Sequence, residues 1–255
     1  MPHSTRRSLH LRPAQSHQWH GDKVMHKDFR SMGWFRYMTH LQGYIWRPSQ
    51  RMQAMLNETM RKTGLTDALK AGPVIGMHVR HGDACGESIR GRSCEPLEAY
   101  MKYADQLRAQ TGINTIYLAT DSEDVLKDTE NFPDYNFLTW REAHALPKKL
   151  KRVMGITTLW WDVVYQRNAE ERHEKNNREV AEHAILEMTM LSKASLFIGK
   201  STSNFYRTAL ELKAASCDCM PAFYSLDSPW CFDFAIKAGV NVDEEGTRVN
   251  NQWLC

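Results

Sequence analysis

The sequence predicts an α/β fold, a Rossmann-like parallel sheet with helices on both faces. Short runs that are apolar throughout alternate with longer segments in which apolar residues recur at helical spacing, as expected for strands buried on both faces. Polar residues follow several apolar runs directly, and ligands of parallel sheets bind beyond the carboxyl ends of the strands. The composition agrees, because 42% of the 255 residues are hydrophobic and 25% are charged, which excludes disordered and collagen-like chains.

Helices open the folded part of the chain. Apolar residues recur at helical spacing over residues 34–62, and Pro48 divides this segment into two helices because proline interrupts helical hydrogen bonding. After a Gly-Pro turn, the apolar residues 74–79 form the first predicted strand. Pro96 then suits the first position of the next helix.

Three more apolar runs continue the alternation and complete the predicted sheet. They are residues 115–119, 136–140 and 195–199. Between the last two, an amphipathic helix begins near Arg178, and another helix follows Asn204. This strand–helix order favours parallel pairing, because parallel strands need a crossover connection.

The N-terminal part of the chain is much more basic than the rest. Residues 1–72 hold 12 Lys and Arg against 4 Asp and Glu, although the whole chain has a net charge of only +3. We interpret residues 1–32 as a poorly ordered basic arm, 33–215 as the folded domain and 216–255 as an irregular tail. The basic residues are expected to be solvated rather than to bind nucleic acid. The sequence shows no signal peptide and no apolar run of the ~18 residues that a membrane span needs, so a soluble chain is expected.

The six cysteines leave the redox state open. Cys85 and Cys94 flank a loop rich in Gly and Arg and could pair, whereas Cys217, Cys219 and Cys231 lie in the tail. Disulfides and free thiols are both compatible with this spacing. The Cys-x-Cys at 217 lacks the second Cys or His pair of a structural zinc site, so zinc is not expected.

The densest cluster of candidate functional residues follows the first strand, at residues 78–83 (HVRHGD). Arg80 is well placed for bidentate pairing with a phosphate, and an ion pair that merely fixes a turn is the alternative. A metal held by His78, His81 and Asp83 is disfavoured, because Arg80 would share the side of the strand with His78 and oppose a cation. No metal is therefore expected.

Other strand ends and one helix carry further candidates. Asp121, after the second strand, would suit a sugar diol or a lysine, with helix capping as the alternative. Ser201, Thr202 and Ser203 precede a helix, where hydroxyl and N–H groups either bind an anion or cap the helix. Glu187 could accept two hydrogen bonds from the N–H edge of guanine, with a solvated helix face as the alternative. The strand ends should converge on one cleft.

Four segments together resemble the α-1,6-fucosyltransferase family, including its rhizobial Nod-factor type and, more distantly, the protein O-fucosyltransferases. They are residues 43–48 (GYIWRP), 73–83 (PVIGMHVRHGD), 117–121 (YLATD) and the stretch from 185 to 203. The resemblance implies the C-terminal, donor-binding half of a GT-B glycosyltransferase. Its activity would be inverting transfer of fucose from GDP-fucose to a sugar hydroxyl of a glycan, without a metal or other cofactor.

The resemblance also assigns roles to residues. Arg80 would hold the β-phosphate of the leaving GDP, His78 and Glu187 would read guanine, and Ser203, with Ser201, would hold the diphosphate. The family's general base is a Glu in the loop after the arginine, and Glu87 is the nearest match. The expected set is catalytic Arg80 and Glu87, donor-binding His78, Arg80, His81, Asp83, Asp121, Glu187, Ser201, Thr202 and Ser203, and no metal ligand.

The chain departs from the family at several places. Core-fucosylating members have Arg-Arg-Thr-Asp-Lys where this chain has residues 80–84 (RHGDA), and the cysteine pair that brackets the phosphate loop in animal members is Gly199 and Tyr206 here. The N-terminal half that helps to form the acceptor side is not evident, so a partner that supplies it is one expectation. The family implies the Golgi lumen as the compartment.

Two other functions remain open from the residues alone. One is a module that binds GDP or a GDP-sugar without transferring it. The other is a histidine phosphatase, in which Arg80-His81-Gly82 would follow a strand and His81 would be the nucleophile. The phosphatase is less favoured, because its motif belongs to an opening strand and the later fucosyltransferase-like segments would have no role.

Overall fold

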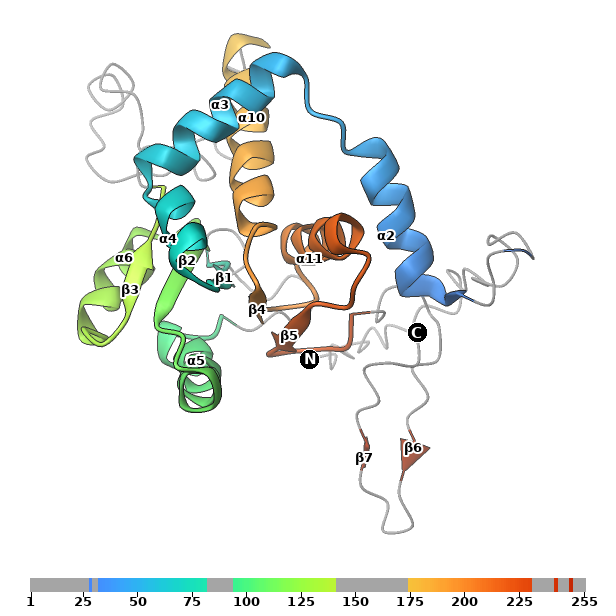
Figure 1. Ribbon diagram of the computed structural model, residues 1–255. Coiled ribbons are helices and arrows are strands. Elements are labelled where there is room, and N and C mark those ends of the chain that lie inside the picture. The colour runs from blue at the N-terminus through green and yellow to red at the C-terminus, as the bar shows by residue number, and fades with distance from the viewer. Residues whose placement is uncertain are drawn as a thin grey trace, which may run out of the picture.

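The computed structural model of the protein describes residues 28, 32–81, 94–140, 174–230, 241–242 and 248–249. Its core is a sheet of five parallel strands in the order β3-β2-β1-β4-β5 (Figure 1). The strands are β1 (Ile75–Val79), β2 (Thr115–Thr120), β3 (Asn136–Leu138), β4 (Leu196–Gly199) and β5 (Ala222–Ser225). The predicted α/β fold with a parallel sheet is confirmed.

Helices connect and cover these strands. They are α2 (Trp34–Ile45), α3 (Gln50–Lys62), α4 (Leu65–Ala71), α5 (Leu97–Thr111), α6 (Glu123–Asp128), α10 (Glu174–Leu191) and α11 (Asn204–Cys217), with the 3₁₀ turn η4 (Thr129–Asn131) after α6. The predicted break at Pro48 is confirmed, and Ser49 begins α3 by accepting a hydrogen bond from the Met52 N–H at 3.3 Å. Pro96 occupies the N-cap of α5, one position before the expected one.

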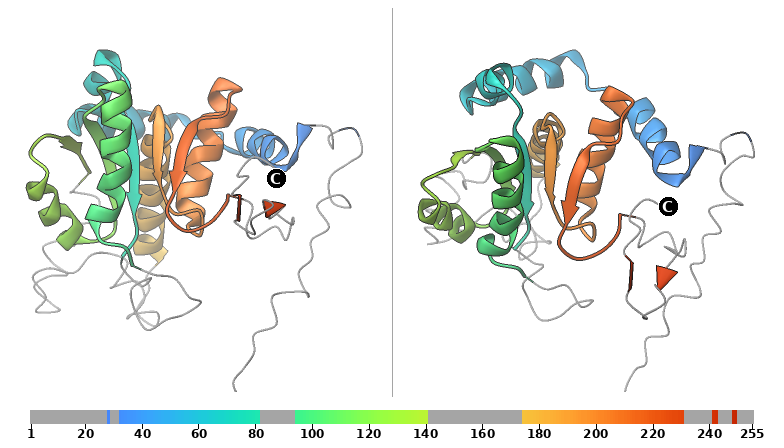
Figure 2. Two further views of the ribbon diagram at one scale, coloured as in Figure 1. Left: turned by 90° about the horizontal axis from the view of Figure 1, so that it is seen from below. Right: turned by 60° about the horizontal axis from the view of Figure 1, so that its bottom comes forward.

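The two faces of the sheet are covered by different helices. Figure 1 shows α5 on one side of the sheet and α10 and α11 on the other, and Figure 2 shows the same layers from two further directions. The core beneath α5 and α6 contains Met77 and Leu118, and the core beneath α10 and α11 contains Tyr117 and Phe197. Side chains alternate along each strand, so β2 and β4 contribute to both cores.

The strand order creates a switch point beside the middle strand. From β1 the chain proceeds to β2 and β3 on one side, and later to β4 and β5 on the other. β1 therefore pairs with both β2 and β4, with Met77 opposite Leu118 and Ile198. The crevice between the carboxyl ends of β1 and β4 is where an open α/β sheet of this kind binds its ligand.

The C-terminal segment is more regular than the sequence predicted. Residues 216–255 were expected to be irregular, but α11 extends to Cys217, and β5 adds a strand beside β4, with Gly199 opposite Ser225. Asn241–Val242 (β6) and Arg248–Val249 (β7) also pair, in antiparallel orientation. The four-residue β5 was missed because it is a short, half-buried edge strand whose apolar run is only three residues long.

The structure shows the redox state of the cysteines that lie in the described residues. Cys217 and Cys219 form a disulfide, and Cys94 is disulfide-bonded as well. Cys85 and Cys231, which the sequence left as candidates, lie outside the described residues. Within the part of the chain that the structure describes, no helix is long and apolar enough to cross a membrane.

Candidate functional site

Arg80 leaves the carboxyl end of β1 and forms an ion pair with Asp121 at the end of β2. Arg80 Nη1 lies 3.0 Å from Asp121 Oδ2, and Asp121 Oδ1 accepts the backbone N–H of His81 at 2.7 Å. The Asp121 side chain is 6% exposed, whereas that of Arg80 is 35% exposed. One carboxylate thus fixes the turn after β1 and orients a guanidinium that still reaches the surface. The ion pair that the sequence left open as another role for Arg80 is therefore present. The guanidinium is still exposed enough to contact a ligand.

Asp121 does not cap the following helix. Ser122 is the N-cap of α6, and its hydroxyl accepts the Val125 N–H at 3.4 Å. Among the described residues Asp121 pairs with an arginine rather than with a lysine, and this ion pair orients Arg80. A contact of Asp121 with a sugar diol stays a prediction.

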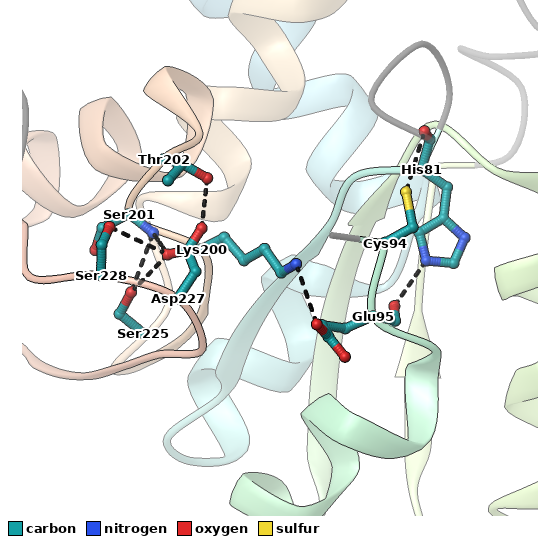
Figure 3. A network of polar contacts seen from close by, with 9 residues as sticks. All are labelled: His81, Cys94, Glu95, Lys200, Ser201, Thr202, Ser225, Asp227 and Ser228. Atoms are coloured by element: carbon teal, nitrogen blue, oxygen red, sulfur yellow. Dashed lines mark hydrogen bonds and ion pairs between the residues drawn. The ribbon is translucent and has the colours of Figure 1, made fainter. Parts of the chain in front are cut away.

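His81 is tied to the start of α5 across the loop that follows β1. Its Nε2 lies 2.8 Å from the carbonyl oxygen of Glu95, so Nε2 must donate the proton. Figure 3 shows this contact, together with the nearby sulfur of Cys94. The His81 ring thus links the end of β1 to the start of α5.

His78 lies inside the sheet beneath α11. It is 6% exposed, and its ring stacks on Phe205 with the centroids 4.9 Å apart and the planes at 17°. Burial, assisted by the charge of Arg80, lowers the pKa of His78 to about 3, so the imidazole is neutral near pH 7. Its Nδ1 is buried and makes no hydrogen bond to any described residue. A buried ring nitrogen without a partner is a ready contact for a ligand.

Glu187 is buried under the same face of the sheet. It lies on α10, is 5% exposed, and adjoins residues of the core. Its charge acts on Tyr117 of β2, because burial raises the pKa of the Tyr117 hydroxyl well above its ordinary value and Glu187 raises it further. The solvated helix face that the sequence left as an alternative is therefore wrong.

The loop between β4 and α11 already binds a carboxylate. The Ser201 N–H donates to Asp227 Oδ1 at 2.9 Å and to Ser225 Oγ at 3.1 Å, and the Thr202 hydroxyl donates to Asp227 Oδ2. Figure 3 shows Asp227 against this loop. Two of the groups expected to hold a diphosphate thus hold an anionic side chain. Asp227 was missed because it lies 26 residues beyond Ser201, in the segment predicted to be irregular.

The remaining hydroxyls of this loop are not used for capping. Ser203 is the N-cap residue of α11, but its side chain makes no capping hydrogen bond. Ser201 Oγ is buried and has no hydrogen-bond partner among the residues that the structure describes. Simple helix capping, the alternative for residues 201–203, does not describe this arrangement.

Lys200 is a second residue that the sequence analysis missed. It directly follows β4, its side chain is 10% exposed, and its Nζ lies 3.9 Å from Glu95 Oε1. Burial lowers the pKa of Lys200, and the carboxylates of Glu95 and Asp227 act against that shift. Its position directly after an apolar run was the available signal, but the burial of its side chain was not visible in the sequence.

Gly199 and Tyr206 close the β4–α11 loop by direct packing. A Cβ added at Gly199 would lie 2.3 Å from Tyr206 Cδ2, so only glycine fits there. The Tyr206 hydroxyl also donates to the Tyr224 carbonyl oxygen at 2.8 Å, which links the start of α11 to β5.

Two expected site residues, Asp83 and Glu87, lie outside the described residues. Within residues 32–81, 94–140 and 174–230, no group of three or more His, Cys, Asp or Glu side chains is arranged to hold a metal ion.

The fold and these contacts define a Rossmann-like α/β protein with basic and hydroxyl side chains at the switch point of its sheet. A model of the alpha-(1,6)-fucosyltransferase N- and catalytic domains matches residues 21–153. The match spans more than half of the chain, which therefore belongs to this family of glycosyltransferases. The matched segment includes His78, Arg80 and Asp121, and the resemblance noted in the sequence is confirmed at the level of the family.

Proposed function

We propose that this chain binds GDP-fucose and transfers fucose, with inversion, to a sugar hydroxyl of a glycan. The observation that carries the proposal is Arg80, partly exposed at the switch point and oriented by the buried carboxylate of Asp121. A guanidinium fixed in this way can meet the diphosphate of a nucleotide sugar in bidentate fashion.

In the proposed reaction, the acceptor oxygen forms a bond to the anomeric carbon of fucose. The bond from that carbon to the β-phosphate oxygen breaks, and its electron pair leaves with GDP. Arg80 stabilises the charge that grows on the leaving diphosphate, and such preorganised donors contribute most where charge develops in the transition state. A base accepts the proton of the acceptor hydroxyl, and Glu87 is our candidate by family resemblance.

The guanine base is proposed to bind on the face of the sheet covered by α10 and α11. Glu187 supplies a buried carboxylate that can accept from guanine N1–H and N2–H. On the same face, neutral His78 supplies a ring nitrogen that has no hydrogen bond to any described residue. Ser203 and Ser201 offer hydroxyls for the phosphates at the start of α11. We propose binding without a metal, because side-chain cations would supply the charge.

The acceptor and the compartment are also proposals from the family. They are an N-linked glycan on a protein and the Golgi lumen. The acceptor side of the site would come from outside the donor-binding domain described above, in the same protein or in a partner.

Calorimetry with GDP, ADP and UDP, with and without EDTA, tests the binding part of the proposal. We expect the tightest binding for GDP and no effect of EDTA. Equal affinity for the three nucleotides would remove guanine recognition, and a loss of binding in EDTA would remove metal independence.

Turnover of Arg80→Lys tests the catalytic part. The substitution keeps the positive charge but removes the paired N–H donors of the guanidinium. The rate of transfer or hydrolysis of GDP-fucose should therefore fall about 10²–10³-fold, which is more than the fall in GDP affinity. Arg108→Lys is a matched control, because Arg108 pairs with Asp134 at 3.1 Å near the opposite end of the sheet. Wild-type turnover in Arg80→Lys would exclude this role. Tight GDP binding without transfer or hydrolysis in the wild type would instead identify a binding module.

A further inference from the structure

The C-terminal end of α11 carries a disulfide between residues that are only two positions apart. Cys217 is the last residue of α11, Cys219 follows it after Asp218, and all three residues are exposed. A bridge this short closes a very small loop, so it restricts the unfolded chain far less than a long-range bridge does. Exposed disulfides are also the ones that thiols reduce most readily. These features are typical of a disulfide that exchanges rather than of one that stabilises a fold.

A cavity gives access to this disulfide. It lies between the start of α2 and the end of α11, two helices that pack on each other (Figure 1), and its volume is about 260 Å³. Cys219 lines the cavity together with Phe35, Arg36 and Met220. The volume is below the ~300–1,000 Å³ of sites for drug-sized ligands, so the cavity suits a small organic thiol rather than a thiol on another protein.

Arg36 provides a positive charge at the same cavity. Its Nη2 donates to Asp218 Oδ1 at 2.9 Å, which uses one of the five N–H donors of the guanidinium. The Arg36 side chain is 55% exposed, so it also reaches the solvent from which a small thiol would arrive. The nucleophile in disulfide exchange is the thiolate anion, and a nearby cation therefore favours its approach.

The chain around the disulfide can accommodate its opening. Cys217 Sγ lies 3.2 Å from the Lys213 carbonyl oxygen, to which a disulfide sulfur cannot donate because it has no proton. A Cys217 thiol would donate to this oxygen. The N–H groups of Asp218 and Cys219 both donate to the Ala214 carbonyl oxygen, so backbone hydrogen bonds also hold the end of α11.

We propose that the Cys217–Cys219 disulfide is a thiol–disulfide exchange site for a low-molecular-weight thiol. The thiolate of the small molecule attacks Cys219 Sγ from the cavity, a bond forms between these two sulfurs, and the Cys217–Cys219 bond breaks. Its electron pair leaves with Cys217, which takes up the proton that the small thiol lost. The products are a mixed disulfide on Cys219 and a thiol on Cys217.

A second molecule of the small thiol completes the reduction. Its thiolate attacks the sulfur of the first small molecule, the two leave as a disulfide, and Cys219 becomes a thiol. Two thiols are thereby oxidised and one protein disulfide is reduced. The exchange does not depend on the proposed transfer of fucose.

Mass spectrometry after incubation with reduced glutathione tests the site in the wild type. Iodoacetamide traps free thiols at chosen times, and fragmentation of the peptide then distinguishes Cys217 from Cys219. We expect glutathione on Cys219 and a trapped thiol on Cys217. The disulfide of Cys94 is the internal comparison, and the Cys217–Cys219 disulfide should open about 10-fold faster or more.

Arg36→Gln tests the contribution of the positive charge. The rate of opening by glutathione should fall about 2- to 5-fold, as expected for the loss of one exposed charge. Arg61→Gln is the matched control, because Arg61 is an exposed arginine that pairs with Glu58 on α3 at 3.6 Å, and its rate should equal that of the wild type. Thermal unfolding verifies that each variant is folded.

Equal rates for the two disulfides, or slower opening of the Cys217–Cys219 disulfide, would overturn the exchange site. Glutathione on Cys217 alone would overturn attack from the cavity, and a wild-type rate in Arg36→Gln would overturn the role of Arg36. No nucleotide is present in these assays. A failed exchange therefore leaves the proposed fucose transfer intact, and failed GDP binding leaves the exchange site intact.

Discussion

The two faces of the sheet differ in what they bury. The α5 face, formed by Ile75, Met77, Val79, Ile116, Leu118 and Ile198, is apolar and packs on α5 and α6. The α10 face carries His78 and Tyr117 and lies beneath α10 and α11, where Glu187 is also buried. One sheet thus has one face suited to stability and one that bears buried polar groups at a cost in stability.

This difference indicates where function lies. Buried polar atoms in folded proteins almost always have partners, and those that lack one call for an explanation. On the α10 face, His78 Nδ1 and the Tyr117 hydroxyl are buried without a hydrogen bond to any described residue. Substitutions on the α5 face should therefore change stability, and substitutions on the α10 face should change ligand binding more than stability.

Leu118→Ala is expected to have the largest effect. Leu118 is fully buried on the α5 face, and removing such a side chain typically costs about 2–5 kcal/mol of unfolding free energy. Urea denaturation measures this loss, and GDP affinity of the folded fraction should be unchanged. Leu41→Ala on the exposed side of α2 is the control, with an expected change within about 0.5 kcal/mol. A small loss in Leu118→Ala would contradict the division between the faces.

Glu187→Gln should weaken GDP binding by about 1–3 kcal/mol, because guanine loses its charged acceptor. Calorimetry with GDP and IDP sharpens the test, since IDP lacks the N2 amino group and should bind the wild type less tightly than GDP does. The control is Glu182→Gln on the same helix, where Glu182 pairs with Arg51 instead. If both variants bind GDP like the wild type, Glu187 does not read the base.

His78 should contribute a loss of stability in acid. Its pKa is lowered from 6.5 to about 3 by burial and by Arg80, so between these values the unfolded chain binds a proton that the folded chain does not. This contribution is present above pH 6.5 and is lost as the pH falls towards 3, by about 2 kcal/mol between pH 6.5 and 5. The pH dependence of the unfolding free energy of His78→Leu should differ from that of the wild type by this contribution, whereas that of exposed His40→Leu should match the wild type. An unchanged slope in His78→Leu would show that His78 is not the group responsible.

Glu211 should give a smaller dependence of opposite sign. Burial raises the pKa of Glu211 on α11 to about 7, although Trp230 donates to its carboxylate at 3.1 Å. The folded chain keeps a proton that the unfolded chain loses, so this contribution is present below pH 4.5 and is lost as the pH rises through 7, by on the order of 1 kcal/mol per pH unit. Because the contributions of His78 and Glu211 oppose each other between pH 4.5 and 6.5, the stability of Glu211→Gln should rise more steeply with pH than that of the wild type, and that of exposed Glu98→Gln should not. Equal slopes in Glu211→Gln and the wild type would contradict this assignment.

Much of the fold could be predicted because burial on both faces leaves a mark in the sequence. The apolar runs at β1, β2, β3 and β4 were sufficient to place four strands, and Pro48 was sufficient to separate two helices. β5 was not predicted in this way, because a half-buried edge strand of four residues leaves only a short apolar run.

The site was predictable in its residue types but not in its pairings. Arg80 and Asp121 stand at the ends of adjacent strands, yet the sequence did not show that they would pair with each other. Asp227 and Lys200 were missed because their roles depend on chain segments that meet only in the fold. Glu187 was recognised as a candidate, but its burial became apparent only when α10 was placed against the sheet.

The contact of Gly199 with Tyr206 has a consequence for the conditions that the loop tolerates. The resemblance places a cysteine pair at these two positions in animal members of the family, whereas an aromatic ring rests directly on a glycine here. A disulfide at these positions would be broken by a strong reductant. Van der Waals packing of a ring on a glycine is not affected by a reductant. The closure of residues 200–205 should therefore be independent of dithiothreitol, and a cysteine could replace Gly199 only if Tyr206 were replaced as well.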